Sequence, residues 1–161
     1  MNIKSLLDAI GEAEGARPDY WKGNLYDLTL GRLNLIRPIS TQTIAEVKST
    51  QKWMVDTLRK ASGAVGKYQI INKTLIDLQK TMKFKNTDVF SAELQDRIAI
   101  KLLERRGLKK FLKGELHLYD FAKNLSKEWA SLPNPETGVS YYGQRTHFST
   151  KEMLKILEEL L

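Results

Sequence analysis

The fold begins in the stretch Leu6-Leu7-Asp8-Ala9-Ile10-Gly11-Glu12-Ala13-Glu14-Gly15, a helical segment that ends on a carboxylate. Its apolar residues recur at helical spacing and predict one buried stripe, and Gly15 is expected to end the helix. The same period places Glu14 on the apolar face, whereas Glu12 points away. Burial against apolar neighbours disfavours the charged form, which would suit Glu14 to donate a proton near neutral pH. A surface acid near a helix end is the plainer alternative for this segment taken alone.

Length and composition indicate one compact domain over residues 1–161. The chain is 42% hydrophobic and has only four prolines, and it shows no linker and no internal repeat. No apolar run approaches the ~20 residues that span a bilayer, and the first ten residues lack a signal-peptide core. We therefore expect a soluble protein that is made in the cytoplasm without a signal peptide.

The side chains available for chemistry are limited. The chain has no cysteine, which excludes disulfides and thiol chemistry. A zinc site would need carboxylates beside the only two histidines, His117 and His147. We expect neither a metal nor a cofactor.

A formal net charge of +7 predicts attraction to a polyanion, which could be nucleic acid, an anionic membrane or a bacterial cell wall. The densest basic cluster lies at residues 105–113. Cations are favoured at a helix C-terminus, so a solvated helix end is the better explanation of this cluster taken alone.

Periodicity and capping signals predict a mainly helical α+β fold. A second helix is expected from Thr41, capped by Ser40 or Thr41, and a capping box is expected at Ser149 and Glu152 before the last helix. Residues 16–40 lose the helical period and favour a small β-rich insert with a short hairpin. The remaining helices are expected at about 72–82, 91–105, 108–112 and 117–130.

A glycine-rich stretch follows the second helix at residues 61–70, Ala-Ser-Gly-Ala-Val-Gly-Lys-Tyr-Gln-Ile. Its glycines would let the backbone approach a ligand closely. Tyr68 offers a flat face and Gln69 a donor–acceptor pair, which together suit a sugar. Without further context the stretch is a flexible loop between helices.

The sequence of this stretch resembles the glycine-rich stretch of the lambda-type lysozymes, the endolysin family of bacteriophage lambda. The N-terminal third matches that family more loosely, at Ala13-Glu14-Gly15 and Tyr26-Asp27. The stretch from Ser40 to Lys60 looks longer than in the lambda endolysin and closer to prophage or virion-associated relatives. Further matching segments are Gln95-Asp96, Ala99, Glu104-Arg105-Arg106-Gly107-Leu108, Trp129-Ala130-Ser131-Leu132-Pro133 and Tyr142-Gly143-Gln144.

The resemblance implies a lysozyme-like fold and a monomeric enzyme that cleaves the β-1,4 bond between N-acetylmuramic acid and N-acetylglucosamine. Its target would be the glycan strands of periplasmic peptidoglycan, in phage-type lysis. Glu14 would be the catalytic acid/base of a lytic transglycosylase that takes a proton from the muramic acid C6 hydroxyl and leaves 1,6-anhydro ends. The resemblance implies substrate binding by Asp27, Tyr68, Gln69, Tyr142 and Gln144.

Two other functions remain open at this point. A hydrolytic muramidase would need a second carboxylate, for which Asp27 is the nearest candidate and Asp19 the next, although Asp27 is equally explained as a structural hydrogen-bond acceptor. A basic helical module could bind nucleic acid through residues 105–113, but the basic residues are spread along the chain and no helix-turn-helix pattern stands out.

The tryptophans divide by context. We expect Trp53 and Trp129 in the core, whereas Trp21, in the insert, is as well explained as a sugar platform.

Overall fold

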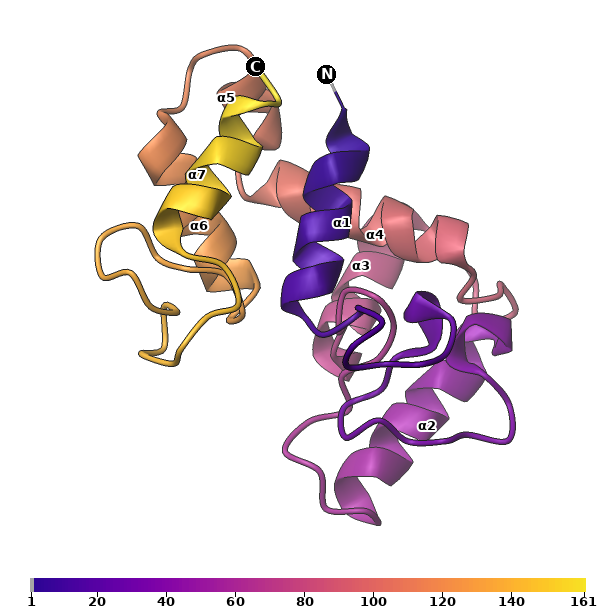
Figure 1. Ribbon diagram of the computed structural model, residues 1–161. Helices are drawn as coiled ribbons and strands as arrows, with labels where there is room; N and C mark the ends of the chain where they lie inside the picture. Colours follow the sequence, from indigo (N-terminus) through magenta and orange to yellow (C-terminus); the bar gives the residue numbers. More distant parts are fainter. Residues whose placement is uncertain (1) are drawn as a thin grey trace. The chain divides into compact units, whose positions relative to one another are not determined.

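The computed structural model describes residues 2–161, and within them the chain is mainly helical (Figure 1). Every expected helix is present, within a few residues of its expected bounds. The helices are α1 (Ile3–Ala13), α2 (Ile44–Asp56), α3 (Asn72–Met82), α4 (Ala92–Arg105), α5 (Leu108–Leu112), α6 (Leu118–Glu128) and α7 (Thr150–Glu158). None of the helices in residues 2–161 combines the length and the apolar character that crossing a bilayer requires.

The helices belong to two compact units. Unit 1 contains the described residues up to Glu14 together with Ala99–Leu161, and unit 2 contains Gly15–Ile98. The boundaries therefore fall directly after Glu14 and inside α4. Because α4 contributes to both units, one continuous helix is shared between them.

Unit 1 is a helical cluster in which α7 packs against α1 and α6, and α5 packs against α6. The rings of Phe111 and Phe121 stack with centroids 4.6 Å apart, and both side chains are buried. Ser149 and Glu152 form the expected capping box at the start of α7. Burial of each large apolar side chain contributes about 1.5–3 kcal/mol, which makes this core the main source of stability for the unit.

Unit 2 packs α2 against α3 and adds two short 3₁₀ helices, η1 (Leu25–Asp27) and η2 (Ile39–Thr41). The start of α2 differs from the expectation. Thr43, and neither Ser40 nor Thr41, caps the helix, because Glu46 lies three residues later and completes a capping box with it. Ser40 and Thr41 belong instead to η2.

The prediction of a small β-rich insert with a hairpin at residues 16–40 is not confirmed. Among residues 2–161 the β pairing consists of isolated bridges, and none of them pairs two residues within 16–40. Residues 28–30 pair instead with the glycine-rich stretch: Leu30 N–H donates to Ala64 O at 2.9 Å, and Gly66 N–H donates to Leu28 O at 2.7 Å. The distant partner satisfies the backbone groups that a local hairpin would have used.

Candidate active site

Glu14 caps the C-terminal end of α1 in unit 1. The helix ends there because Gly15 adopts a φ of +99°, and Glu14 N–H still donates to Ile10 O at 3.0 Å. The apolar stripe of α1 is buried, and Glu12 is exposed, as its position in the helical period predicted. The side chain of Glu14 is therefore fixed at the end of a buried helix face.

Ser131 is the hydrogen-bonding partner of Glu14. Its Oγ donates to Glu14 Oε1 at 2.6 Å, and it lies in the turn after α6, where Leu132 N–H donates to Trp129 O at 3.0 Å. Sequence reasoning gave Ser131 no role. Its only signal was membership of the Trp129–Pro133 segment that resembles the lambda-type lysozymes.

The environment of Glu14 changes its acidity. Burial raises the pKa of Glu14 from 4.5 to about 7, whereas the hydroxyl and backbone of Ser131 favour the ionised form and lower the pKa. Desolvation is the larger effect, although the residue as a whole is only partly buried. Near neutral pH this carboxyl is therefore distributed between its protonated and ionised forms, as proton transfer in both directions requires.

Tyr142 and Gln144 lie in the same unit as Glu14, on a loop that Ser140 organises. The backbone N–H groups of Tyr142 and Gln144 donate to Ser140 Oγ at 3.2 and 2.9 Å, and Ser140 is buried. The ring of Tyr142 is 65% exposed and meets Tyr141 edge-on, with centroids 5.5 Å apart. An exposed aromatic pair on an ordered turn is a surface on which a sugar ring can stack.

His147 ties the far end of this loop to α1. Its Nε2 lies 2.9 Å from Oε1 of Glu12, and Glu12 precedes Glu14 by two residues in the sequence. The loop that carries Tyr142 is thus held at both ends by unit 1.

The glycine-rich stretch lies in unit 2 and is held by two buried glutamines. From α2, Gln51 Nε2 donates to Gly63 O at 3.0 Å and to Ile70 O at 2.9 Å. From α4, Gln95 Oε1 accepts from Lys67 N–H at 3.0 Å. A Cβ at Gly63 would lie 2.7 Å from Gln51 O, and one at Gly66 would lie 2.3 Å from Gln95 Oε1. These glycines therefore admit the glutamines of neighbouring helices, which is a structural reason for their presence.

Tyr68 departs from its predicted role as a flat face for sugar. The side chain is only 1% exposed, and its hydroxyl donates to Asp96 Oδ1 at 2.5 Å. The hydroxyl of Tyr26 donates to the same carboxylate at 2.9 Å, and the ammonium of Lys67 lies over both rings, 5.0 and 5.4 Å from their centroids. Burial and the bond to Asp96 raise the pKa of Tyr68. Tyr68 thus secures the glycine-rich stretch to α4.

Gln69 and Asp27 also make internal bonds in unit 2. Gln69 has a φ of +49°, and its Nε2 donates to Gly66 O at 2.9 Å. Asp27 Oδ1 accepts from Ser40 N–H at 2.7 Å, which joins η1 to η2. This contact matches the structural role that the sequence left open for Asp27. Asp19 is mostly exposed and pairs with Arg17 at 3.2 Å.

The three tryptophans differ in exposure. Trp129 is buried as expected, but the expectation of a core position for Trp53 is wrong, because its side chain on α2 is 41% exposed. Trp21 is partly buried, and its indole N–H donates to Asn24 O at 2.9 Å.

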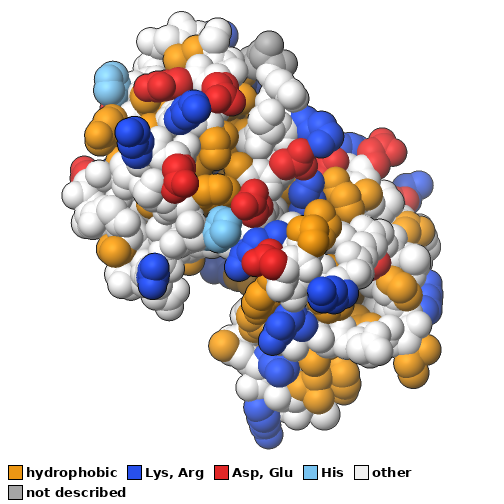
Figure 2. Space-filling view, in the orientation of Figure 1, with side chains coloured by type: hydrophobic (Ala, Val, Ile, Leu, Met, Phe, Trp, Pro, Cys, Tyr) orange, Lys and Arg blue, Asp and Glu red, His pale blue; other side chains and the backbone are white. Residues whose placement is uncertain are grey.

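The basic cluster at residues 105–113 is largely engaged within unit 1. Arg105 and Arg106 both bind the side chain of Glu128, at 2.9 and 2.6 Å, and Lys109 binds Glu104 at 2.9 Å. On the face drawn in Figure 2, acidic side chains lie among the basic ones. The cluster therefore offers much less free charge than its sequence suggests, which weakens the nucleic-acid hypothesis.

Metal ligands are not gathered in the part of the chain that the structure describes, where no three His, Asp or Glu side chains come together as a metal site requires.

Comparison with known proteins gives a consistent family and fold. The sequence model of the endolysin family matches residues 4–159. A solved structure of bacteriophage lambda lysozyme complexed with a chitohexasaccharide is similar at a TM-score of 0.67 and 23% identity, covering 98% of this chain and 92% of that chain. A second structure of lysozyme from bacteriophage lambda has a TM-score of 0.66 at 21% identity, with the same coverage. No curated protein sequence gives a significant match.

Proposed function

The chain belongs to the endolysin family, and from that premise we propose that it cleaves the β-1,4 glycosidic bond between N-acetylmuramic acid and N-acetylglucosamine in peptidoglycan. The observation that carries the proposal is the buried Glu14 carboxyl, with a pKa of about 7 and a bond from Ser131. The chitohexasaccharide bound to the similar lambda lysozyme supports a β-linked amino-sugar polymer as substrate. The setting would be phage-type lysis, with peptidoglycan strands in the periplasm as the target.

Glu14 would act first as an acid. In its protonated form it gives its proton to the leaving glycosidic oxygen while an oxocarbenium-like transition state develops on the muramic acid ring. The resulting carboxylate is then stabilised by the hydroxyl of Ser131, whose bond favours the ionised form. Ser131 is therefore a positioning residue that holds one carboxylate oxygen in place through both steps.

We propose that the second step is a transglycosylation. The Glu14 carboxylate takes the proton of the muramic acid C6 hydroxyl, the C6 oxygen bonds to C1, and a 1,6-anhydro ring closes without consuming water. This route needs no second carboxylate. It is consistent with the engagement of Asp27 by Ser40 N–H, whereas a hydrolytic muramidase would use Asp27 as its base or nucleophile.

The test is Glu14→Gln in a turbidity assay on Gram-negative cells stripped of their outer membrane. The variant should fold normally and lose at least the ~10²–10⁴-fold that general acid–base catalysis contributes. Mass spectrometry of the wild-type digest should find muropeptides lighter by one water than those from a hydrolytic lysozyme.

Glu12→Gln is the matched control, because it removes a neighbouring charge and keeps an oxygen that can accept from His147. Wild-type lysis by the Glu14 variant would rule out Glu14 as the acid. Reducing ends without the anhydro ring would instead show that water is the acceptor and restore Asp27 as the second carboxylate.

A further inference from the structure

A groove outside the proposed catalytic machinery follows the outer side of α2 in unit 2. Two adjoining hollows of about 410 and 510 Å³ share Arg37, Gln42, Ser49 and Thr50, and together they form one depression between α2 and residues 34–37. Each hollow is within the ~300–1,000 Å³ of small-molecule sites. None of the lining residues is Glu14, Ser131 or a residue that the resemblance assigns to substrate.

Part of the groove lining is apolar and open to solvent. Trp53 on α2 is 41% exposed, and Ile36 on the facing segment is fully exposed. Leu35, next to Ile36, also lines the groove. A half-exposed indole is a large apolar face that water solvates poorly, and it is available for stacking by a flat ligand.

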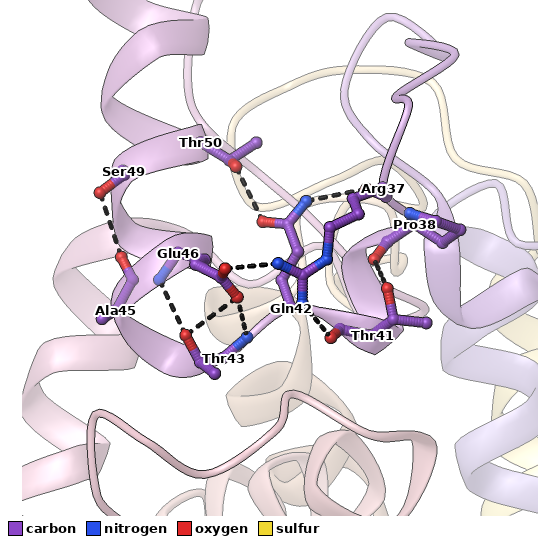
Figure 3. Close-up of polar contacts among 9 residues, drawn as sticks. All are labelled: Arg37, Pro38, Thr41, Gln42, Thr43, Ala45, Glu46, Ser49 and Thr50. Carbon is purple, nitrogen blue, oxygen red and sulfur yellow. Dashed lines mark hydrogen bonds and ion pairs between the residues drawn. The ribbon is translucent and has the colours of Figure 1, made fainter.

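The rest of the lining is polar and locked (Figure 3), and Ser49 and Thr50 lie on the same face of α2 as Trp53. Gln42 is 6% exposed; its Nε2 donates to Arg37 O at 2.9 Å, and its Oε1 accepts from Thr50 Oγ1 at 2.8 Å. Ser49 Oγ donates to Ala45 O at 3.1 Å. Because both hydroxyl hydrogens are used inside the protein, the oxygens of Ser49 and Thr50 retain lone pairs that can accept hydrogen bonds from a ligand.

The charges of the groove cancel. The guanidinium of Arg37 donates to Glu46 and, at 3.0 Å, to Thr41 O, and Glu46 in turn accepts from the backbone of Thr43. These contacts use only part of the guanidinium, whose further N–H groups can still donate. Arg37 and Glu46 are the only charged side chains among the residues that line the two hollows. A locked polar lining without net charge disfavours a phosphate polymer or a peptide carboxylate and favours a neutral ligand rich in hydroxyl and amide groups.

We propose that this groove is a second glycan site, which binds an N-acetylhexosamine residue of a peptidoglycan strand with one ring face on Trp53. Hydroxyl groups of the sugar donate to Ser49 and Thr50, and the N–H groups of Arg37 and the amide of Asn34 are available to its oxygens. The proposal rests on the proposed function, since it takes the same polymer as its ligand. A site built from residues other than Glu14 and Ser131 would hold the enzyme on the cell wall between cleavage events.

The experiment is an NMR titration of the Glu14→Gln chain with tri-N-acetylchitotriose, observing the Trp53 indole and the backbone amides of the groove. The indole and the amides of Gln42 and Thr50 should shift and saturate together. Adding Trp53→Ala should abolish the shifts of the Gln42 and Thr50 amides and weaken retention on purified sacculi by at least about fivefold, the loss of a contact worth ~1 kcal/mol. Val55→Ala is the matched control, because Val55 is 40% exposed on the same helix but does not line the groove.

The outcomes separate this proposal from the proposed function. Shifts confined to residues outside the groove, or equal sacculus retention by the Trp53 and Val55 variants, would overturn the second site. The second glycan site would also be overturned if a stem tetrapeptide of peptidoglycan shifted the Trp53 indole and chitotriose did not. The titration uses a chain without its catalytic acid, so wild-type protein that fails to lyse cells would contradict the enzyme assignment and leave the saccharide site intact.

Discussion

At the scale of single residues, the bond from Ser131 limits how far burial raises the pKa of Glu14, the proposed catalyst. Ser131 lowers the pKa of Glu14 against the larger effect of burial, so Ser131→Ala should raise that pKa above about 7. A bond to a charged group is worth ~1.5–3 kcal/mol, or about one to two pH units. The protonated acid should then persist to higher pH, and the alkaline limb of the kcat/KM profile should shift to higher pH by about the same one to two units.

The pH–rate profile of the Ser131 variant measures this shift. Ser126→Ala is a suitable control, because it removes a buried serine hydroxyl that donates to Lys123 O and leaves the Glu14 carboxyl untouched. An alkaline limb that stays in place, or moves to lower pH, would mean that Ser131 does not tune the acid.

The raised pKa of Glu14 also predicts how stability depends on pH. The carboxyl titrates near 4.5 in the unfolded chain and about 7 in the folded chain, so the folded state holds its proton more tightly. The contribution of this tighter proton binding to the free energy of unfolding is roughly 3 kcal/mol. It is fully present below pH ~4.5 and is lost as the pH rises through ~7. Glu14→Gln does not titrate, so its melting temperature relative to wild type should rise between pH 5 and pH 8. A constant difference would indicate a solvated carboxyl.

At the scale of elements, the glycine-rich stretch is expected to depend on its contact with α4. Gly66 has a φ of +80°, and its Cβ position is 2.3 Å from Gln95 Oε1. Gly66→Ala should therefore displace Gln95 and break its buried bonds to Lys67 N–H, Tyr26 O and Phe90 O. We expect a loss of more than about 2 kcal/mol in the free energy of unfolding.

Gly114→Ala is the control that measures the backbone-conformation part of that loss. Gly114 has a similar φ of +72° but nothing within 4 Å of its Cβ position, so it should lose only the ~1–2 kcal/mol of the backbone conformation. Urea unfolding of the two variants measures the difference. Equal losses would show that Gln95 yields without cost.

Elements that local contacts determine could be predicted from the sequence, whereas elements that distant contacts determine could not. The helices were predictable because their stripes and caps are local, as at Ser149 and Glu152. Residues 28–30 were not, because their bonding partners are residues 64–66, which no local pattern indicates. Glu14 became a candidate from its place in a helical period, whereas Ser131 is 117 residues away and has no periodic signal. For Tyr68, an aromatic hydroxyl suits a sugar and an internal contact equally well, and only the structure places Asp96 beside it.

At the scale of the whole molecule, the net charge of +7 should attract the protein to the anionic surface of the cell wall. Part of the basic charge is neutralised internally, as at Glu128, but the excess remains positive and attracts an anionic polymer at long range. Raising the salt concentration from about 0.1 to 1 M shortens the screening length from ~10 to ~3 Å. Retention on sacculi should then fall several-fold, whereas turnover of short soluble glycan fragments should change much less.

Chitin particles separate charge from sugar recognition, because chitin offers N-acetylglucosamine without phosphate or carboxylate groups. Binding to chitin draws on the proposed glycan contacts, including the neutral groove at Trp53, and should resist salt. Binding to sacculi adds the electrostatic attraction and should respond to it. A pull-down of the Glu14→Gln chain on both polymers across the salt series measures the two contributions. Equal salt sensitivity on chitin and sacculi would show that the net charge does not attract the protein to the wall, and that retention depends on local contacts alone.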